Sequence, residues 1–309
     1  MGEIDVVDNS SKTIKILEDF LLKQCKKIKN LGEIITNSNK NNKVAVIVEP
    51  RNHKLLEAVI RNVMYNLGKE WNLHIFGYDL NYIKSCFPKS NFTFTKISCN
   101  NLLVNQYNTL LTSLDFWNSI SEENILIFQT DSFIMNNIPN LNKFLKYPFI
   151  GGVYHYYNFK NYLDIYDKVI GYTIWDVSND QNIVHFHNSP YKKFSICGGF
   201  SLRLKSAMIK CIKEVCISDI IKYREKFNLN VDYYKTCIVS EDTYFQNALE
   251  LLQYNLPSLE VCNEFCNNLQ YPIFNQDAFG IHNINKEFLI KNYKDEIENF
   301  IQNTYEKSI

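Results

Sequence analysis

The sequence predicts an α/β protein built on a mostly parallel sheet with helices on both faces. Two short apolar runs, VAVIV at residues 44–48 and ILIF at residues 125–128, are typical of strands buried on both faces. After the first run, apolar residues recur at helical spacing over residues 55–67, and Gly68 provides a natural end for that helix. Such alternation of strand and helix favours a parallel sheet.

The first part of the chain is predicted to be an appendage to this domain. Residues 11–29 show helical periodicity after a pair of serines that can cap a helix. Residues 36–43, with the sequence TNSNKNNK, read as a polar linker. Neither an internal repeat nor a second composition divides the rest of the chain. We therefore predict a helix and linker over residues 1–42 and one domain over residues 43–309.

The remaining elements are predicted from the same patterns of apolar residues and helix caps. Further strands are expected at residues 73–77, 92–97, 147–154 and 195–203, and further helices at residues 103–118, 240–252 and 286–302. The 240–252 helix opens with Ser240 at the cap position and two acids in its first turn, which together favour a helix N-terminus.

Composition describes a folded protein without a dominant charge. Hydrophobic residues make up 46% of the chain, and 33 basic residues balance 33 acidic ones, so no nucleic-acid footprint is expected. No apolar run reaches the roughly 20 residues of a membrane span, and the first residues lack the features of a secretory signal. The nine cysteines contain no C-x-x-C pair, which argues against a zinc site or a disulfide scaffold. We therefore expect a cytoplasmic protein with no transmembrane segment.

Polar residues come after two of the predicted strands, at the edge where open α/β sheets bind ligands. Glu49, Arg51 and Asn52 come directly after the first strand, and Asp131 comes after the strand at residues 125–128. The first strand is not followed by a glycine-rich phosphate loop, which argues against a dinucleotide site and against a P-loop. Asp131 either caps the next turn or is held in a cleft by the strand before it.

Four later features have both an ordinary and a functional interpretation. His282, in FGIHN, is either structural or completes a metal site with Asp131. Glycines 198 and 199, in CGGFSLR, form a tight turn or let the backbone approach a ligand. The acid pair of SEDTYF, Glu241 and Asp242, complements a helix dipole or acts on a substrate. The HFH triplet at residues 185–187 has metal-ligand spacing, but it lacks a nearby acid and favours a surface hairpin.

In this order, these segments resemble the GT-A glycosyltransferases. In that superfamily a buried strand delivers a D-x-D-type acid to the cleft, a glycine-rich segment lines the donor sugar, an acid pair begins a helix and a late histidine completes the metal site. More narrowly, the set is similar to a little-characterised family of that clan that is named only as a domain of unknown function. The segments that carry this likeness, within about residues 43–285, are VAVIVEPR, LLTSLDFW, ILIFQTDS, YPFIGG, GGFSLR and EDTYF.

The resemblance implies a GT-A-like sandwich with a mixed, mostly parallel sheet. It implies a hexosyltransferase-like enzyme that moves a sugar from a nucleotide sugar, expected to be a UDP-sugar, to a hydroxyl group of a glycan, a protein or a small molecule. The cofactor would be a divalent cation, Mn²⁺ or Mg²⁺, held by Asp131 and His282.

The resemblance also assigns roles to the other candidates. Gly198 and Gly199 would line the donor, while Glu49, Arg51 and Asn52 are placed to meet its nucleoside. Asp242 is the candidate base for an inverting reaction, with Glu241 as an acceptor-binding partner or reserve. If the enzyme retains configuration, neither acid need act as a base.

Two positions depart from the family pattern. Gln129 stands where D-x-D has its first acid, so the metal site would rely on Asp131, His282 and the diphosphate. Cys197 stands where relatives in the narrower family often have asparagine. Two other functions therefore remain as alternatives: a nucleotidyltransferase of the same fold, which would need a phosphate loop after the first strand, and a glycan-binding or scaffold protein that has lost activity.

Overall fold

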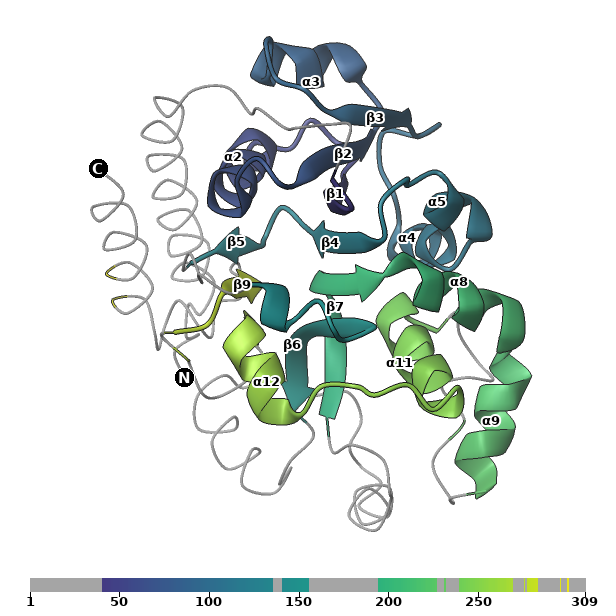
Figure 1. Ribbon diagram of the computed structural model, residues 1–309. Coiled ribbons are helices and arrows are strands. Elements are labelled where there is room, and N and C mark those ends of the chain that lie inside the picture. The colour runs from purple at the N-terminus through teal and green to yellow at the C-terminus, as the bar shows by residue number, and fades with distance from the viewer. Residues whose placement is uncertain are drawn as a thin grey trace, which may run out of the picture.

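A six-stranded mixed sheet forms the centre of the part of the chain that the structure describes (Figure 1). The structure is a computed structural model, and it describes residues 41–135, 141–155, 194–226, 239–268 and 277–282, together with residues 231, 275, 295 and 299. In spatial order the strands are β3 (Thr93–Lys96), β2 (Asn72–Gly77), β1 (Lys43–Val48), β4 (Asn124–Phe128), β7 (Phe194–Leu204) and β6 (Phe149–His155).

The strand pairing confirms the predicted mostly parallel sheet. β1, β2, β3 and β4 run parallel to one another, whereas β7 runs antiparallel to both of its neighbours, β4 and β6. The apolar runs at residues 44–48 and 125–128 lie in the two central strands, where every one of these side chains is buried. Helices on both faces of the sheet exclude water from these side chains, which explains why the two strands are apolar without alternation.

The order in which the chain adds strands to the sheet changes direction between β1 and β4. From β1 the chain passes through α2 (Leu56–Leu67) to β2 and then through α3 (Leu80–Cys86) to β3, always moving toward one edge. β4 then pairs with the opposite side of β1. The carboxyl ends of β1 and β4 therefore flank a topological switch point, where open α/β sheets bind ligands.

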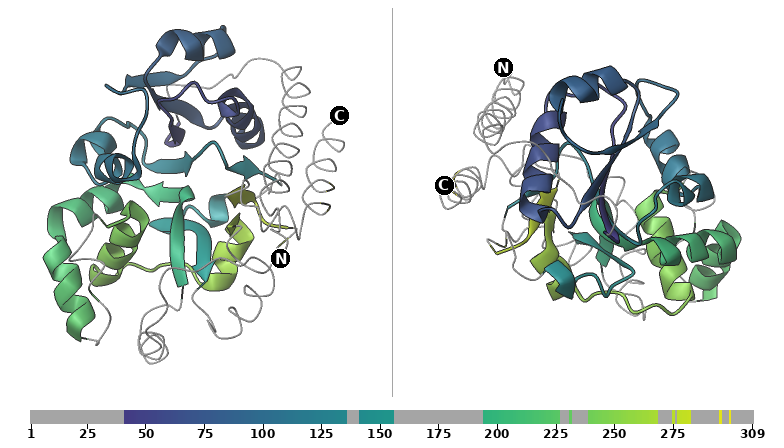
Figure 2. Two further views of the ribbon diagram at one scale, coloured as in Figure 1. Left: turned by 180° about the vertical axis from the view of Figure 1, so that it is seen from behind. Right: turned by 45° about the horizontal axis from the view of Figure 1, so that its top comes forward.

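The helices cover both faces of the sheet, as the sequence predicts. In Figures 1 and 2, α2 and α12 lie on one side, while α4, α5, α8 and α11 lie on the other, with α9 outside them. Their bounds are α4 (Val104–Leu111), α5 (Leu114–Asn118), α8 (Lys205–Glu214), α9 (Ile217–Lys226), α11 (Glu241–Leu251) and α12 (Leu259–Phe265), and a 3₁₀ turn spans Leu141–Lys143.

A small second sheet joins the segment after β4 to the end of the described chain. It consists of β5 (Phe133–Ile134), β9 (Gly280–His282) and β8 (Cys266–Asn268), and Phe133 pairs with Ile281. On the other side of β5, the buried amide of Asn62 bonds both backbone groups of Ile134, at 2.7 and 3.0 Å, as a neighbouring strand would. This pairing brings the late segment with His282 beside the segment that begins at Asp131.

The predicted helix over residues 103–118 is wrong in one respect, because the structure divides it into α4 and α5. Ser113 begins the second helix, and its side-chain oxygen accepts a hydrogen bond from the Phe116 backbone N–H at 3.3 Å. The indole of Trp117 then donates to the Leu111 carbonyl at 2.7 Å, which satisfies one of the acceptors at the end of α4. A polar Thr-Ser step thus turns the chain where periodicity alone predicts continuation.

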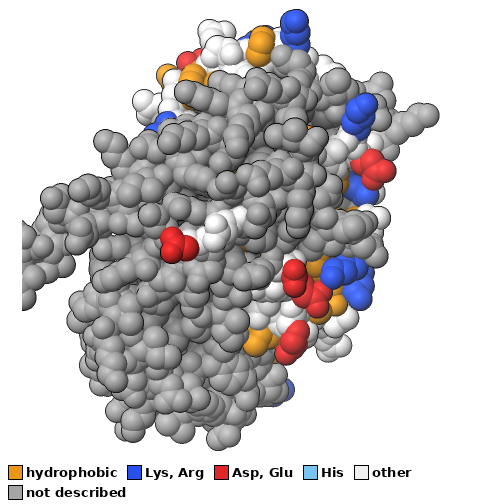
Figure 3. All heavy atoms as spheres, turned by 90° about the vertical axis from the view of Figure 1, so that its left-hand side faces the viewer, with side chains coloured by type: hydrophobic (Ala, Val, Ile, Leu, Met, Phe, Trp, Pro, Cys, Tyr) orange, Lys and Arg blue, Asp and Glu red, His pale blue; other side chains and the backbone are white. Residues whose placement is uncertain are grey.

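Several predicted elements lie outside the described residues. They are the helix over residues 11–29, the helix over residues 286–302 apart from residues 295 and 299, the linker over most of residues 36–43 and the HFH triplet. Among the described helices, none has both the length and the apolar character needed to cross a membrane. On the face shown in Figure 3, acidic and basic side chains of described residues lie close together along the right-hand edge.

One buried histidine makes the stability of the fold depend on pH. His74 lies in β2, stacks on Phe76 at 4.3 Å, and its Nε2 lies 2.8 Å from the hydroxyl of Thr95. Burial lowers the pKa of His74 to about 4, so the unfolded chain binds this proton more tightly than the folded one. Its contribution is complete above pH ~6.5 and is lost as the pH falls toward ~4.

We therefore expect the free energy of unfolding to fall by about 2 to 3 kcal/mol between pH 7 and pH 4.5 through His74 alone. Urea denaturation of the wild type and of His74→Gln at several pH values measures this contribution. The variant should be less sensitive to acid by that amount. Parallel loss of stability in both proteins over this range would contradict the assignment.

Candidate functional site

A cavity of about 540 Å³ opens at the switch point, at the carboxyl ends of β1 and β4. Several parts of the chain line it: the segments after β1 and β4, helix α4, strand β7, the start of α11, and the end of β9. The lining side chains that carry polar chemistry include Glu49, Arg51, Tyr107, Gln129, Asp131, Cys197, Glu241, Asp242 and His282. Its position is the one at which parallel α/β sheets bind ligands.

Three side chains converge on one point in this cavity. His282 Nε2 lies 3.5 Å from Asp131 Oδ1 and 3.2 Å from Gln129 Oε1. Asp131 Oδ1 is buried and makes no hydrogen bond, a costly state for a carboxylate oxygen. The turn from β4 into β5 that carries Asp131 is itself well bonded, since Ser132 donates to the Gly199 carbonyl and accepts from the Gln129 N–H. The backbone therefore holds the unbonded carboxylate oxygen in place.

Cys197 and Gly199 hold the His282 imidazole in position from its two ring nitrogens. Cys197 Sγ lies 3.3 Å from His282 Nδ1, and a thiol can donate to or accept from that nitrogen, so the contact suits either tautomer. Gly199 lies against the other nitrogen, because a Cβ atom there would come within 2.0 Å of His282 Nε2. Glycine is therefore required at residue 199 by the close approach of the imidazole.

The donor atoms at this point fit a divalent cation. Two ligands of one ion at about 2.1 Å each cannot lie more than about 4.2 Å apart, and both measured separations are shorter than that. The described residues contain no group of three His, Cys, Asp or Glu side chains able to share an ion. The third protein donor here is the amide oxygen of Gln129, which is a neutral ligand.

A second polar pair lies where the chain leaves β1. Glu49 is buried, and Arg51 binds its carboxylate through two bonds of 2.7 Å, from Nε and from one terminal nitrogen. Glu49 Oε1 also accepts the Arg51 backbone N–H at 3.0 Å. The hydrogen bond with Glu49 raises the pKa of Arg51, and the charge of Asp131 adds to the effect. Arg51 thus brings a positive charge to the rim of the cavity.

Beneath the cavity, Arg203 and Glu241 form a buried ion pair. The guanidinium binds both carboxylate oxygens, at 2.5 and 2.9 Å, and bonds Ser201 Oγ at 2.9 Å through its Nε. It also lies over the ring of Phe149 at 4.7 Å. Burial raises the pKa of Glu241 while Arg203 lowers it, so this carboxylate depends on Arg203 to stay charged.

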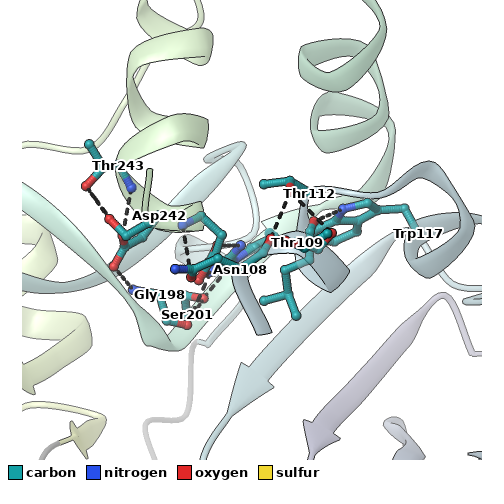
Figure 4. Close-up of polar contacts among 12 residues, drawn as sticks. Asn108, Thr109, Thr112, Trp117, Gly198, Ser201, Asp242 and Thr243 are labelled. Atoms are coloured by element: carbon teal, nitrogen blue, oxygen red, sulfur yellow. Dashed lines mark hydrogen bonds and ion pairs between the residues drawn. The ribbon is translucent and has the colours of Figure 1, made fainter. Parts of the chain in front are cut away.

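Asp242, next to this pair, is held by backbone N–H groups instead of by a cation. Its Oδ2 accepts from Gly198 at 3.1 Å, and its Oδ1 accepts from Thr243 at 2.7 Å (Figure 4). Ser240 occupies the cap position of α11 as predicted, but its side chain does not cap the helix. Instead, Asn108 Oδ1 of α4 accepts the Glu241 N–H at 3.3 Å. The bonds from Gly198 and Thr243 hold the Asp242 side chain at the cavity wall.

The structure brings most of the candidates predicted from the sequence into this one cavity. Two of them do not line it. Asn52 is exposed, and Gly198 lies just beneath the wall, where a Cβ atom would meet Glu241 Oε1 at 2.1 Å. The residues His185 and His187 lie outside the described residues.

Three side chains that the sequence pattern does not select belong to the site. In the sequence, Arg203 is only the last residue of GGFSLR, and the residues next to it do not indicate a buried cation. Asn108 and Tyr107 lie in a short helix with no acid, histidine or glycine to draw attention to it. Only the packing of α4 against α11 reveals them.

Fold and site together define an α/β protein with a polar ligand cleft at its switch point. Over residues 91–282, more than half of the chain, the sequence matches a family described as "Protein of unknown function (DUF5672)". The chain belongs to this family. No curated protein matches the sequence.

Two solved structures show a distant similarity. One is a mannosyltransferase, PcManGT from Pyrobaculum calidifontis in complex with GDP-Man and Mn²⁺, with a TM-score of 0.39 and 11% identity over 79% of this chain. The other is the apo-form glycosyltransferase GlyE of Streptococcus pneumoniae TIGR4, with a TM-score of 0.38 and 10% identity over 86% of this chain. The similarity covers 64% of each of those chains, which is just under two thirds of their length.

Proposed function

We propose that this chain is a glycosyltransferase that uses a nucleotide sugar with the help of a divalent cation. The observation that carries the proposal is the convergence of Asp131 Oδ1, His282 Nε2 and Gln129 Oε1 at the carboxyl end of β4, with the carboxylate oxygen buried and unbonded. A buried acceptor without a partner indicates a ligand that completes it. The GT-A resemblance of the same segments supports the same interpretation.

In this proposal, Asp131, His282 and the Gln129 amide would hold the cation. When bound, it would offset the negative charge that grows on the departing diphosphate. Arg51 supplies a second positive charge at the cavity rim, and its bidentate bonds to Glu49 keep the guanidinium in a defined position. Glu49 and Arg51 would then bind the nucleoside diphosphate.

Asp242, which lines the same cavity, is the proposed base. The acceptor oxygen forms a bond to the anomeric carbon, the bond from that carbon to the phosphate oxygen breaks, and its electron pair leaves with the diphosphate. Asp242 takes the proton of the acceptor hydroxyl in this inverting step. Asp242 lies in the first turn of α11 and lines the cavity. Glu241 is unsuited to the same task because Arg203 occupies both of its oxygens.

The direct test is binding and hydrolysis of nucleotide sugars by the purified chain. Thermal shift is measured with UDP-glucose, UDP-galactose, UDP-N-acetylglucosamine and GDP-mannose, each with and without Mn²⁺, and release of UDP or GDP is monitored. We expect at least one donor to stabilise the chain more strongly with Mn²⁺ than without it. Binding without any release of diphosphate would favour a binding protein, and no response to any donor would count against the proposal.

For the donor that responds, Asp242→Asn is expected to lower kcat by about 10²- to 10⁴-fold, because a positioned general base contributes about that much. Affinity for the donor should change little, since asparagine can still accept the Gly198 N–H. Asp115→Asn is the matched control. Asp115 occupies the same second position of a helix, in α5, but it is exposed and does not line the cavity. An unchanged kcat in Asp242→Asn would favour a retaining reaction without this base.

A further inference from the structure

Two buried side-chain atoms among the described residues make no hydrogen bond, and both belong to residues that line the cleft. One is Asp131 Oδ1, which the proposed cation would satisfy. The other is the hydroxyl of Tyr107, which the proposed mechanism does not use. A buried hydroxyl without a partner is destabilising, so its presence in a cavity wall indicates a ligand group that pairs with it.

Tyr107 lies in the same cavity as the proposed base and the proposed cation ligands. It lies in α4, one residue before Asn108, whose side chain bonds the start of α11 beside Asp242 (Figure 4). Tyr107 lines the same cavity as Gln129, Glu241 and Asp242. Gln129 in turn contacts His282. Tyr107 therefore shares one cavity with the proposed base and the proposed cation ligands.

The charges around this hydroxyl decide which chemical group fits it. Burial raises the pKa of Tyr107, and the charge of Glu241 raises it further. The Gln129 side chain approaches the hydroxyl and lowers this pKa, but the two groups do not meet hydrogen-bond geometry. The hydroxyl is therefore a neutral donor at pH 7. A phosphate here would face the carboxylate of Asp242, whereas a neutral hydroxyl group can accept from Tyr107 and donate to a nearby carboxylate or amide oxygen.

We propose that the Tyr107 hydroxyl binds a hydroxyl group of the sugar in the nucleotide-sugar donor and so helps to select the sugar. The inference rests on the proposed function. In that reaction the anomeric carbon is attacked from the side of the base and loses its bond on the side of the diphosphate. The sugar would therefore lie between Asp242 and Asp131, in the cavity that Tyr107 also lines.

The test compares Tyr107→Phe with the wild type in two measurements. The first is the Tm of the chain without ligand. Phenylalanine keeps the ring and removes only the unpaired hydroxyl, so the Tm should stay the same or rise. The second is titration calorimetry in Mn²⁺ with the sugar nucleotide that binds the wild type, such as UDP-glucose or GDP-mannose, and with the matching UDP or GDP. We expect about tenfold weaker binding of the sugar nucleotide and less than a twofold change for the nucleoside diphosphate.

Tyr244→Phe is the matched control, because Tyr244 is a buried tyrosine whose hydroxyl does have partners. It donates to the carbonyl of Cys211 at 3.0 Å or of Val215 at 2.8 Å. Its loss should lower the Tm and leave both affinities unchanged. A similar fall in Tm for Tyr107→Phe would show a structural role and overturn the inference. Equal weakening of both ligands, or of neither, would also overturn it.

The outcomes separate this inference from the proposal on which it rests. If the wild type binds no nucleotide and no nucleotide sugar, the proposed function fails and the role of Tyr107 fails with it. If the wild type binds a sugar nucleotide and Tyr107→Phe binds it equally well, the role of Tyr107 alone is wrong. If the variant instead needs more acceptor at saturating donor, Tyr107 belongs to the acceptor site and the assignment to the donor sugar is wrong.

Discussion

Replacing Asp131 with asparagine is expected to abolish the Mn²⁺-dependent part of nucleotide binding and to lower turnover by about 10³-fold. Asparagine keeps the shape of the side chain but removes the charge from the oxygen that lies 3.5 Å from His282 Nε2. Cation assistance is worth several kcal/mol in the transition state, and each 1.36 kcal/mol is a factor of ten in rate. Thermal shift with UDP or GDP, with and without Mn²⁺, measures the binding, and diphosphate release measures the turnover.

Two further variants sharpen this prediction. Gln129→Glu adds a negative charge beside His282, where D-x-D has its first acid, and should tighten Mn²⁺ binding about tenfold, because ligand charge controls the affinity of such sites. Asp277→Asn, at an exposed residue close to β9, should change neither binding nor turnover. Unchanged nucleotide binding and turnover in Asp131→Asn would reject the metal site and favour another mechanism or an inactive binding protein.

Replacing Arg203 with methionine is expected to lower the free energy of unfolding by about 3 to 5 kcal/mol, the usual loss when one partner of a buried ion pair is removed. The change leaves the Glu241 carboxylate buried without its cation, and Glu241 begins the helix that carries Asp242. Turnover should therefore fall together with stability. Urea denaturation at pH 7 measures the first effect, and diphosphate release at a temperature where the variant is folded measures the second.

The double variant Arg203→Met/Glu241→Leu separates loss of the pair from loss of packing. Because it removes both charges, we expect it to recover most of the stability that the single variant loses. Lys143→Met provides the exposed comparison. Lys143 pairs with Glu264 at 2.7 Å, but both side chains are close to half exposed, so the loss should stay below about 1 kcal/mol. Additive losses in the double variant would contradict a coupled buried pair.

The elements of the fold that the sequence predicts well are those whose own pattern decides them. The run at residues 44–48 and the run at residues 125–128 are strands because each is apolar throughout and short. Helix α2 ends at Gly68, which adopts a φ of 71° that other residues rarely take. The division of residues 103–118 into two helices could not be predicted in this way, because Thr112 and Ser113 end the first helix without a glycine or proline.

The candidate site divides in a similar way. An acid after a buried strand and an acid pair at a helix start are local signals, so Asp131, Glu241 and Asp242 can be selected from the sequence. The separate roles of Glu241 and Asp242 cannot be predicted from the sequence, because these two acids are adjacent and chemically alike. The structure distinguishes them by their partners: Arg203 holds Glu241, while backbone N–H groups hold Asp242.

By itself, then, the sequence determined the elements, the mostly parallel sheet and a short set of acids, glycines and one histidine with cleft chemistry. These depend on local periodicity, helix caps and residue type, all of which are properties of neighbouring residues. Only the tertiary structure decided that His282 meets Asp131, that Arg203 neutralises Glu241 and that the Tyr107 hydroxyl lacks a partner. The two paired contacts join residues that are 151 and 38 positions apart. They arise from strand pairing and helix packing, which bring together side chains that no local pattern connects.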